Sequence, residues 1–367
     1  MTAAGSMSPP RISFSLPKEL EATQPPEARG LARDEVRLLI AGSSGLQHAR
    51  FRDLPRFLQP GDLVVVNTSA TLAAAVAGTR SGGHPVVVHF STARDDGTWI
   101  VELRSRDGAG RVRDGVRGES IALPAGVRVQ LLEPFGSSGR NVADTAEDLP
   151  LDGGVRLWRA RVVVEGPVEA YLARYGRPIA YGHLRAPASM AAYQTIFGRE
   201  PGSAEMPSAA RPFTNGLVTD LVTGGVVIAP VLLHAGVSSL DIDEPPQPER
   251  FRVPAATARL VDVTRRAGNR IVAIGTTVTR ALETVARPGG TVEPGSGWTE
   301  LVLGPERPAR VVDALVTGWH APDASHLLLL ESVAGTRLVQ QAYDAALDSG
   351  YLWHEFGDSC LLLPERN

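Results

Sequence analysis

The sequence predicts an α/β protein in which a large α/β domain carries a small inserted antiparallel β domain, either a barrel or a sandwich. Apolar runs alternate with amphipathic stretches in the first and last parts of the chain, as in a fold that alternates strands and helices. Between them, short β-rich runs are separated by turn residues such as Asp95-Asp96-Gly97, which indicates an antiparallel insert. We expect the α/β domain over 11–71 and 165–367, the insert over 72–164 and a disordered tail over 1–10.

The composition is that of a globular protein with two or three domains. The chain has 367 residues, 43% of them hydrophobic. No apolar run reaches the ~20 residues that span a bilayer, so no membrane segment is expected. Residues 1–10 lack the basic and apolar regions of a secretion signal. Cys360 is the only cysteine, which excludes an internal disulfide and a cysteine-built metal site. A cytoplasmic location follows as an expectation.

The first α/β segment ends in a candidate ligand site. We expect a strand over Val36–Ile40, a short helix over Leu54–Phe57 and a strand over Leu63–Val66. The last strand runs into Asn67-Thr68-Ser69. Polar residues after a buried strand are a common site in α/β proteins, and a turn capped by side chains is the alternative.

The insert carries a run of arginines. Five of them lie in Arg104–Arg117, interleaved with Asp107 and Asp114. This pattern favours a solvated hairpin, with a phosphate-contacting edge as the alternative. We expect a mobile loop over 137–150. The expected strands of the insert are Pro85–Phe90, Thr98–Arg104, Val127–Leu132 and Val155–Val164.

The second α/β segment alternates strands and helices more regularly. Its strands should end near His234, Gly275 and His320, at the same sheet edge as Asn67, where ligands bind. The expected helices are 167–175, 213–222, 255–268, 325–333 and 338–349, and the expected strands are 225–233, 271–274, 311–316 and 351–363.

The stretch Arg270–Glu283 has the strongest local pattern. An apolar strand is broken by Gly275, after which Thr276 and Thr277 are candidate helix N-caps. Free backbone N–H groups at such a helix start favour a carboxylate or phosphate, and an ordinary turn between strand and helix is the alternative. Arg280 lies one turn into the helix, where it either lines the pocket or pairs with Glu283.

The remaining chemistry rests on two histidines. The chain contains no H-E-x-x-H, P-loop, G-x-G-x-x-G or G-x-S-x-G motif, so the corresponding protease, nucleotide and hydrolase classes have no support. The eight histidines show no metal spacing. His84 and His89, in the insert, are interpreted as structural. His234 and His320 each follow an expected strand, where a general base or a ligand contact is plausible.

Several motifs in order resemble one family. These are Pro60-Gly-Asp-Leu-Val-Val-Val-Asn67, Tyr193-Gln-Thr, Leu233-His-Ala-Gly236, Gly275-Thr-Thr-Val-Thr-Arg-Ala-Leu-Glu283, Val311-Val-Asp-Ala-Leu followed by His320 and Pro322, and Tyr351 to Asp358. Their order and spacing are similar to those of the S-adenosylmethionine:tRNA ribosyltransferase-isomerases of queuosine biosynthesis.

The resemblance implies an α/β domain with an inserted antiparallel β-barrel. It also implies transfer and isomerisation of the ribosyl moiety of S-adenosylmethionine onto 7-aminomethyl-7-deazaguanine in tRNA, with loss of adenine and methionine. S-adenosylmethionine would be a substrate, no metal is expected, and the tRNA anticodon arm is the expected partner of a monomer or weak dimer. The expected catalytic residues are His234, His320 and Asp358, and the expected donor-binding residues are Asn67, Gly236, Gly275, Thr276, Thr277 and Arg280.

Some motif positions differ from the family pattern. Asn67 is followed by Thr68-Ser69-Ala70 in place of Asp-Thr-Arg, and Pro212 replaces a histidine. Two alternatives therefore stay open beside the tRNA enzyme. One is a paralogue that uses the same donor on a small-molecule acceptor, and the other is a non-catalytic binding protein of the same fold.

Overall fold

The computed structural model describes residues 10–108, 110–136, 154–186, 188–238, 246–322 and 324–365. The expected tail, apart from Pro10, and the expected loop 137–150 lie outside these residues. Short 3-10 helices occupy Lys18–Leu20, Pro26–Arg29, Arg33–Glu35, Phe51–Phe57, Pro124–Gly126, Met190–Tyr193 and Ser208–Ala210.

A nine-stranded sheet forms the centre of the α/β part, in the order β15-β13-β12-β3-β14-β16-β17-β1-β2. Four neighbouring strands at its centre run parallel: β3 (Leu63–Asn67), β12 (Val227–Leu233), β14 (Ile271–Ile274) and β16 (Ala314–Gly318). Because they are parallel, their carboxyl ends meet at one edge, as predicted. The remaining strands are β1 (Arg37–Gly42), β2 (Gly45–Arg50), β13 (Glu249–Val253), β15 (Gly295–Thr299) and β17 (Ser359–Leu363).

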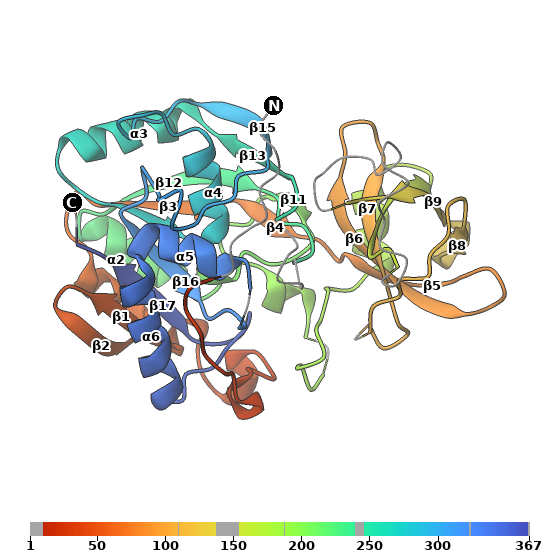
Figure 1. The fold of residues 1–367 in the computed structure, drawn as a ribbon, viewed down its shortest axis with the longest axis horizontal. Helices are drawn as coiled ribbons and strands as arrows, with labels where there is room; N and C mark the ends of the chain where they lie inside the picture. The colour runs from red at the N-terminus through yellow and green to blue at the C-terminus, as the bar shows by residue number, and fades with distance from the viewer. Residues whose placement is uncertain are drawn as a thin grey trace.

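Helices cover both faces of this sheet (Figure 1). Side chains alternate along β3, so Leu63 and Val65 pack into one core while Val64 and Val66 pack into another. The first core contains residues of α3 (Ala255–Arg266), α4 (Thr276–Thr284), α5 (His326–Ala334) and α6 (Thr336–Asp348), and the second contains residues of α2 (Asn215–Thr223) and the 3-10 helix Phe51–Phe57.

The insert is a closed antiparallel barrel, which confirms the predicted fold class. Its strand order is β10-β7-β6-β5-β8-β9, and it lies beside the α/β part (Figure 1). A parallel pair, β4 (Ser69–Thr71) with β11 (Glu200–Ser203), connects the two parts, and α1 (Val168–Tyr175) follows the barrel. The barrel strands are β5 (Ala75–Thr79), β6 (Pro85–Ala93), β7 (Trp99–Arg104), β8 (Ser120–Ala122), β9 (Arg128–Pro134) and β10 (Leu157–Val163).

Two expected strands begin three or more residues later in the structure. The strand expected from Val311 begins at Ala314, because the Asp313 carboxylate accepts the N–H of Ile271 at 2.8 Å before the ladder starts. The strand expected from Tyr351 begins at Ser359, because residues 352–358 form a turn around Asp358. Strand β2 was not predicted, since its exposed residues show no apolar alternation.

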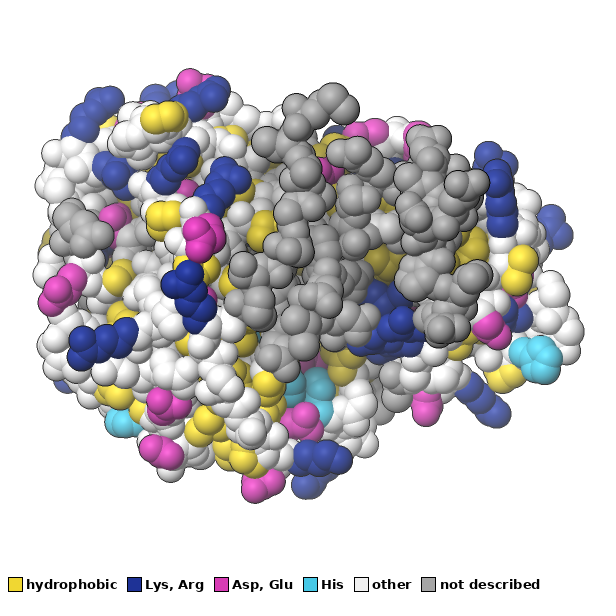
Figure 2. All heavy atoms as spheres, viewed as in Figure 1, with side chains coloured by type: hydrophobic (Ala, Val, Ile, Leu, Met, Phe, Trp, Pro, Cys, Tyr) yellow, Lys and Arg dark blue, Asp and Glu magenta, His cyan; other side chains and the backbone are white. Residues whose placement is uncertain are grey.

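Charges of both signs are interspersed on the face shown in Figure 2. No helix within the described residues is both long and apolar enough to cross a bilayer.

Candidate active site

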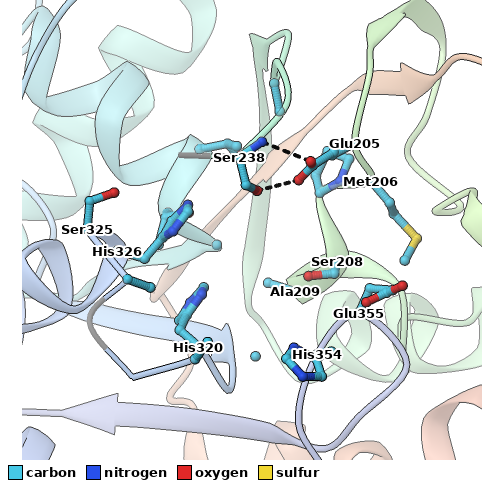
Figure 3. Close-up of a pocket in the computed structure, with 18 of the residues that line it drawn as sticks. Glu205, Met206, Ser208, Ala209, Ser238, His320, Ser325, His326, His354 and Glu355 are labelled. Atoms are coloured by element: carbon cyan, nitrogen blue, oxygen red, sulfur yellow. Dashed lines mark hydrogen bonds between the residues drawn. The ribbon is translucent and has the colours of Figure 1, made fainter. Parts of the chain in front are cut away.

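A cavity of about 800 Å³ lies at the carboxyl edge of the parallel strands. The start of α4, the residues after β16 and the start of α5 line it, together with the loop after β12 and residues 204–209 after β11. Residues in the segments 179–183, 246–249, 301–303 and 354–355 also contribute. Figure 3 shows His320 and His326 on one side of the cavity and Glu205 and Glu355 on the other. Residues far apart in sequence therefore converge on one cavity.

Gly275 sets the path of the chain into α4. Its φ of 91° and ψ of 163° belong to a region that is essentially reserved for glycine. A Cβ here would lie 3.2 Å from that of Ala209. Gly275 is itself the N-cap, so Thr276 and Thr277 are the first helical residues and not the caps that the sequence suggested. All three line the cavity, with the free N–H groups of the helix start beside them.

Asn67 lies behind the wall of the cavity. It is fully buried and does not line the space. Its amide donates to Leu233 O at 2.8 Å and to Thr277 Oγ1 at 3.2 Å. Its oxygen accepts the N–H groups of Ser69 and Leu233, each at 3.0 Å. Because Thr277 Oγ1 accepts from Asn67, the hydroxyl proton of Thr277 remains for a ligand.

Arg280 lines the cavity with its donors already engaged. It forms an ion pair with Glu249 and donates to Leu301 O at 3.2 Å. It also donates to the carbonyls of Gln247 and Thr299, both at 3.4 Å. Glu283 is not its partner, since that carboxylate accepts the N–H groups of residues 310–312. Arg280 therefore fixes the wall of the cavity.

His320 lines the cavity and follows β16, as expected. Its Nε2 lies 3.0 Å from Thr317 Oγ1, and its ring stacks on that of His326 with centroids 4.8 Å apart. Burial lowers the pKa of His320 well below its ordinary value, and His326 and His354 lower it further. Burial also lowers the pKa of His326 to about 4. Both imidazoles are therefore neutral at pH 7 and able to accept a proton.

Two other expected catalytic residues lie outside the cavity lining. His234 Nδ1 lies 2.7 Å from Ser69 Oγ, in a hydrogen-bonded chain that continues to Ser203 at 2.6 Å. Asp358 accepts the N–H of Leu352 at 2.8 Å and forms an ion pair with Arg37 at 3.0 Å. These bonds hold the turn before β17 against β1, so the structure does not bring Asp358 together with His320.

Gly236, expected at the donor site, is buried and lines the cavity. A Cβ at this position would approach Ser91 Oγ to 2.7 Å. A side chain here would force Ser91 to shift, so glycine lets the loop after β12 pack closely against barrel strand β6.

An acidic side of the cavity was not predicted from the sequence. Glu205 accepts from Ser238 N at 2.8 Å, from Ser238 Oγ at 2.5 Å and from the hydroxyl of Tyr181. Burial raises its pKa. Glu355 binds His183 at 3.2 Å, and the His183 ring stacks on His354 with centroids 4.3 Å apart. The loops that carry these residues have no periodic pattern. The one sequence signal for this side of the cavity was the Tyr193-Gln-Thr motif, because Tyr193 also lines the cavity.

Several residues that line the cavity carry polar atoms without a partner. Gln247 is 5% exposed, and both of its amide atoms are unpaired. The Nε1 of Trp319, the hydroxyl of Tyr193 and the Oε1 of Glu355 are unpaired as well. Buried polar groups normally have partners, so this lining is suited to a polar ligand. Across the part of the chain that the structure describes, no cluster of three His, Cys, Asp or Glu could hold a metal.

Comparisons with known proteins bear on the whole chain. A family described as queuosine biosynthesis protein matches residues 10–362. A protein of Moorella thermoacetica named S-adenosylmethionine:tRNA ribosyltransferase-isomerase is 35% identical, over 96% of this chain and 98% of its own. One of Rubrobacter xylanophilus with the same name is 34% identical, over 96% of both chains. The crystal structure of an S-adenosylmethionine tRNA ribosyltransferase from Thermotoga maritima aligns with a TM-score of 0.52 at 27% identity, over 96% of this chain and 99% of that one.

Proposed function

This chain belongs to the queuosine biosynthesis protein family, and from that membership we propose that it is an S-adenosylmethionine:tRNA ribosyltransferase-isomerase. It transfers and isomerises the ribosyl moiety of S-adenosylmethionine onto 7-aminomethyl-7-deazaguanine in tRNA, and it releases adenine and methionine. The match over residues 10–362 carries the proposal. The cavity at the carboxyl edge, lined by residues that carry unpaired polar atoms, supports it.

The donor fits best at the start of α4. The N–H groups after Gly275 and the free hydroxyl proton of Thr277 provide donors for the carboxylate or ribose of S-adenosylmethionine. Thr276 and Gly236 complete this wall. Asn67 and Arg280 act as positioning residues, because their hydrogen bonds are used within the protein.

His320 is our candidate for the first proton transfer. The sulfonium of the donor acidifies the protons on the adjacent 5′ carbon, so a positioned base starts the rearrangement. The proton passes from that carbon to an imidazole nitrogen, and the electron pair stays on the carbon. Burial keeps this imidazole neutral at pH 7, so a nitrogen lone pair is available for the proton. We assign no proton transfer to His234 or Asp358, because neither lines the cavity.

The acceptor side extends beyond the cavity. We propose that the anticodon arm of tRNA lies along the α1 end of the molecule, where Arg174, Arg177 and Arg185 are exposed. The protein would work in the cytoplasm as a monomer or weak dimer, without a metal. We also propose that the inserted domain spans residues 72–164 and that the α/β domain spans residues 11–71 and 165–367.

The test is release of free adenine. The protein is incubated with S-adenosylmethionine, with and without tRNA that carries 7-aminomethyl-7-deazaguanine, and adenine is measured by chromatography. We expect adenine only when that tRNA is present. Release with the free base but not with tRNA would instead identify a small-molecule acceptor. Donor binding without release under any condition would identify a non-catalytic binding protein.

A further inference from the structure

Glu205 is a carboxylate in the cavity without a cationic partner. Its hydrogen-bond donors, Tyr181 and Ser238, are neutral. Across the described chain, no Lys or Arg side chain bonds to it. Enclosed charges are normally paired, so this carboxylate lacks the partner that its surroundings require.

The groups around Glu205 also favour a cation at this position. Burial raises the pKa of Glu205, and the charge of Glu355 raises it further, while the Oε1 of Glu355 has no partner. Tyr193 is 4% exposed, its hydroxyl is unpaired, and Glu355 helps to raise its pKa. Tyr181 bonds to Glu205 and His183 bonds to Glu355. The guanidinium of Arg156 donates to the carbonyl of Ser238 at 3.3 Å and pairs with Glu102, not with Glu205. This wall therefore offers two carboxylates and a free hydroxyl oxygen.

We propose that this wall binds the protonated aminomethyl group of the acceptor base and that Glu205 removes a proton from it. An alkylammonium has three N–H donors, which matches the acceptors on Glu205, Glu355 and Tyr193. The inference rests on the proposed function, because it names which part of that acceptor the wall takes.

The proton transfer prepares the amine for attack. An ammonium has no lone pair, so it must become neutral before it forms the new C–N bond. One N–H bond breaks, the proton forms an O–H bond on the Glu205 carboxylate, and the electron pair stays on nitrogen. Burial, which raises the pKa of Glu205, makes the carboxylate a stronger base and so favours this step.

The proposal separates the two walls by role. The start of α4 holds the donor, and His320 faces it from the same side as His326. Glu205 and Glu355 lie across the cavity (Figure 3). Loss of Glu205 should therefore affect the acceptor and spare the donor.

The experiment compares Glu205→Gln with the wild type. The probes are S-adenosylhomocysteine and two anticodon stem-loop RNAs, one with 7-aminomethyl-7-deazaguanine and one with 7-methyl-7-deazaguanine. We expect the wild type to bind the amine-bearing RNA about tenfold more tightly and Glu205→Gln to lose this preference. S-adenosylhomocysteine binding should stay within about twofold in both. Glu165→Gln, an exposed site beyond the barrel, is the matched control and should behave as the wild type.

A second variant keeps the proposal testable if Glu205→Gln does not fold. Tyr181→Phe removes a hydrogen bond that stabilises the ionised carboxylate, so the pKa of Glu205 should rise. The preference for the amine should remain, and the acidic limb of adenine release should move to higher pH. Three results would overturn the assignment. The acidic limb could stay unchanged in Tyr181→Phe, or Glu205→Gln could keep the preference for the amine-bearing RNA. Glu205→Gln could also lose S-adenosylhomocysteine binding to the same extent as RNA binding. A wild type that neither binds S-adenosylhomocysteine nor releases adenine would overturn the proposed function itself.

Discussion

The Nδ2 of Asn67 lies 3.2 Å from the Oγ1 of Thr277, although 210 positions separate the two residues in the chain. The same amide also bonds to Leu233. One side chain thus joins the end of β3, the end of β12 and the first turn of α4. The shape of the proposed donor site depends on this junction.

Replacing Asn67 with Ala should destabilise the protein by about 3 kcal/mol, because it leaves buried backbone groups of Leu233 and Ser69 without partners. Urea denaturation measures the change. Asn215→Ala, at an exposed position in α2, is the control and should change stability by less than about 0.5 kcal/mol. Equal effects at both sites would mean that Asn67 does not hold the junction.

Replacing Gly275 with Ala should both strain the backbone and displace the start of α4. We expect a loss of about 2 kcal/mol in stability and at least about tenfold weaker S-adenosylhomocysteine binding by calorimetry. Gly268→Ala is the matched control, because Gly268 also has a positive φ, of 78°, but has open space around its Cβ. It should lose about 1 kcal/mol and bind normally. Normal binding by Gly275→Ala would separate this turn from the donor.

The stability of the protein should fall as the pH drops below about 6.5, the ordinary value for histidine. Burial lowers the pKa of His326 to about 4, so the unfolded chain binds a proton before the folded one does. Between pH 7 and 5 this residue alone should cost about 2 kcal/mol, and His320 acts in the same direction. His326→Asn should flatten the profile, while His84→Asn, at an exposed site, should not. If His326→Asn left the slope of stability against pH unchanged, the lowered pKa of His326 would be contradicted.

The affinity for tRNA should depend on salt through exposed arginines near α1. Replacing Arg174 and Arg177 with Gln should lower the slope of log affinity against log salt by about 2 in a gel-shift series. Arg259→Gln with Arg266→Gln, on α3, is the control pair and should leave the slope unchanged. Arg104 should not contribute, because it is 3% exposed and pairs with Glu102 at 3.4 Å. If both double variants gave the same salt slope, the RNA would have to bind to another face of the protein.

Features of the fold that follow from local periodicity could be predicted from the sequence. The apolar runs that end at Asn67, Leu233 and Ile274 predicted strands with a shared edge, and the turn-rich stretch predicted the insert. The position of His320 in the cavity follows from the same logic. Its location there depends on β16 ending beside β14.

The acidic wall could not be predicted in this way. Tyr181, Glu205 and Glu355 lie on loops whose paths are fixed by tertiary contacts and not by a local pattern. His234 and Asp358 show the reverse case. Each lies near a strand, as many site residues do, but hydrogen bonds to Ser69 and Arg37 direct the two side chains elsewhere. A signal for His326 did exist, since it is a polar residue that opens the apolar helix α5.

The long sequence separation between β3 and its neighbouring strands also affects how the nascent chain folds. β3 pairs with β12 and β14, and 166 positions separate Asn67 from Leu233. At a synthesis rate of about 5–20 residues per second, β12 leaves the ribosome about 10–30 s after β3. The barrel strands emerge within that interval and can close on themselves. The apolar run of β3 meanwhile lacks both of its partner strands, so it stays exposed until they emerge.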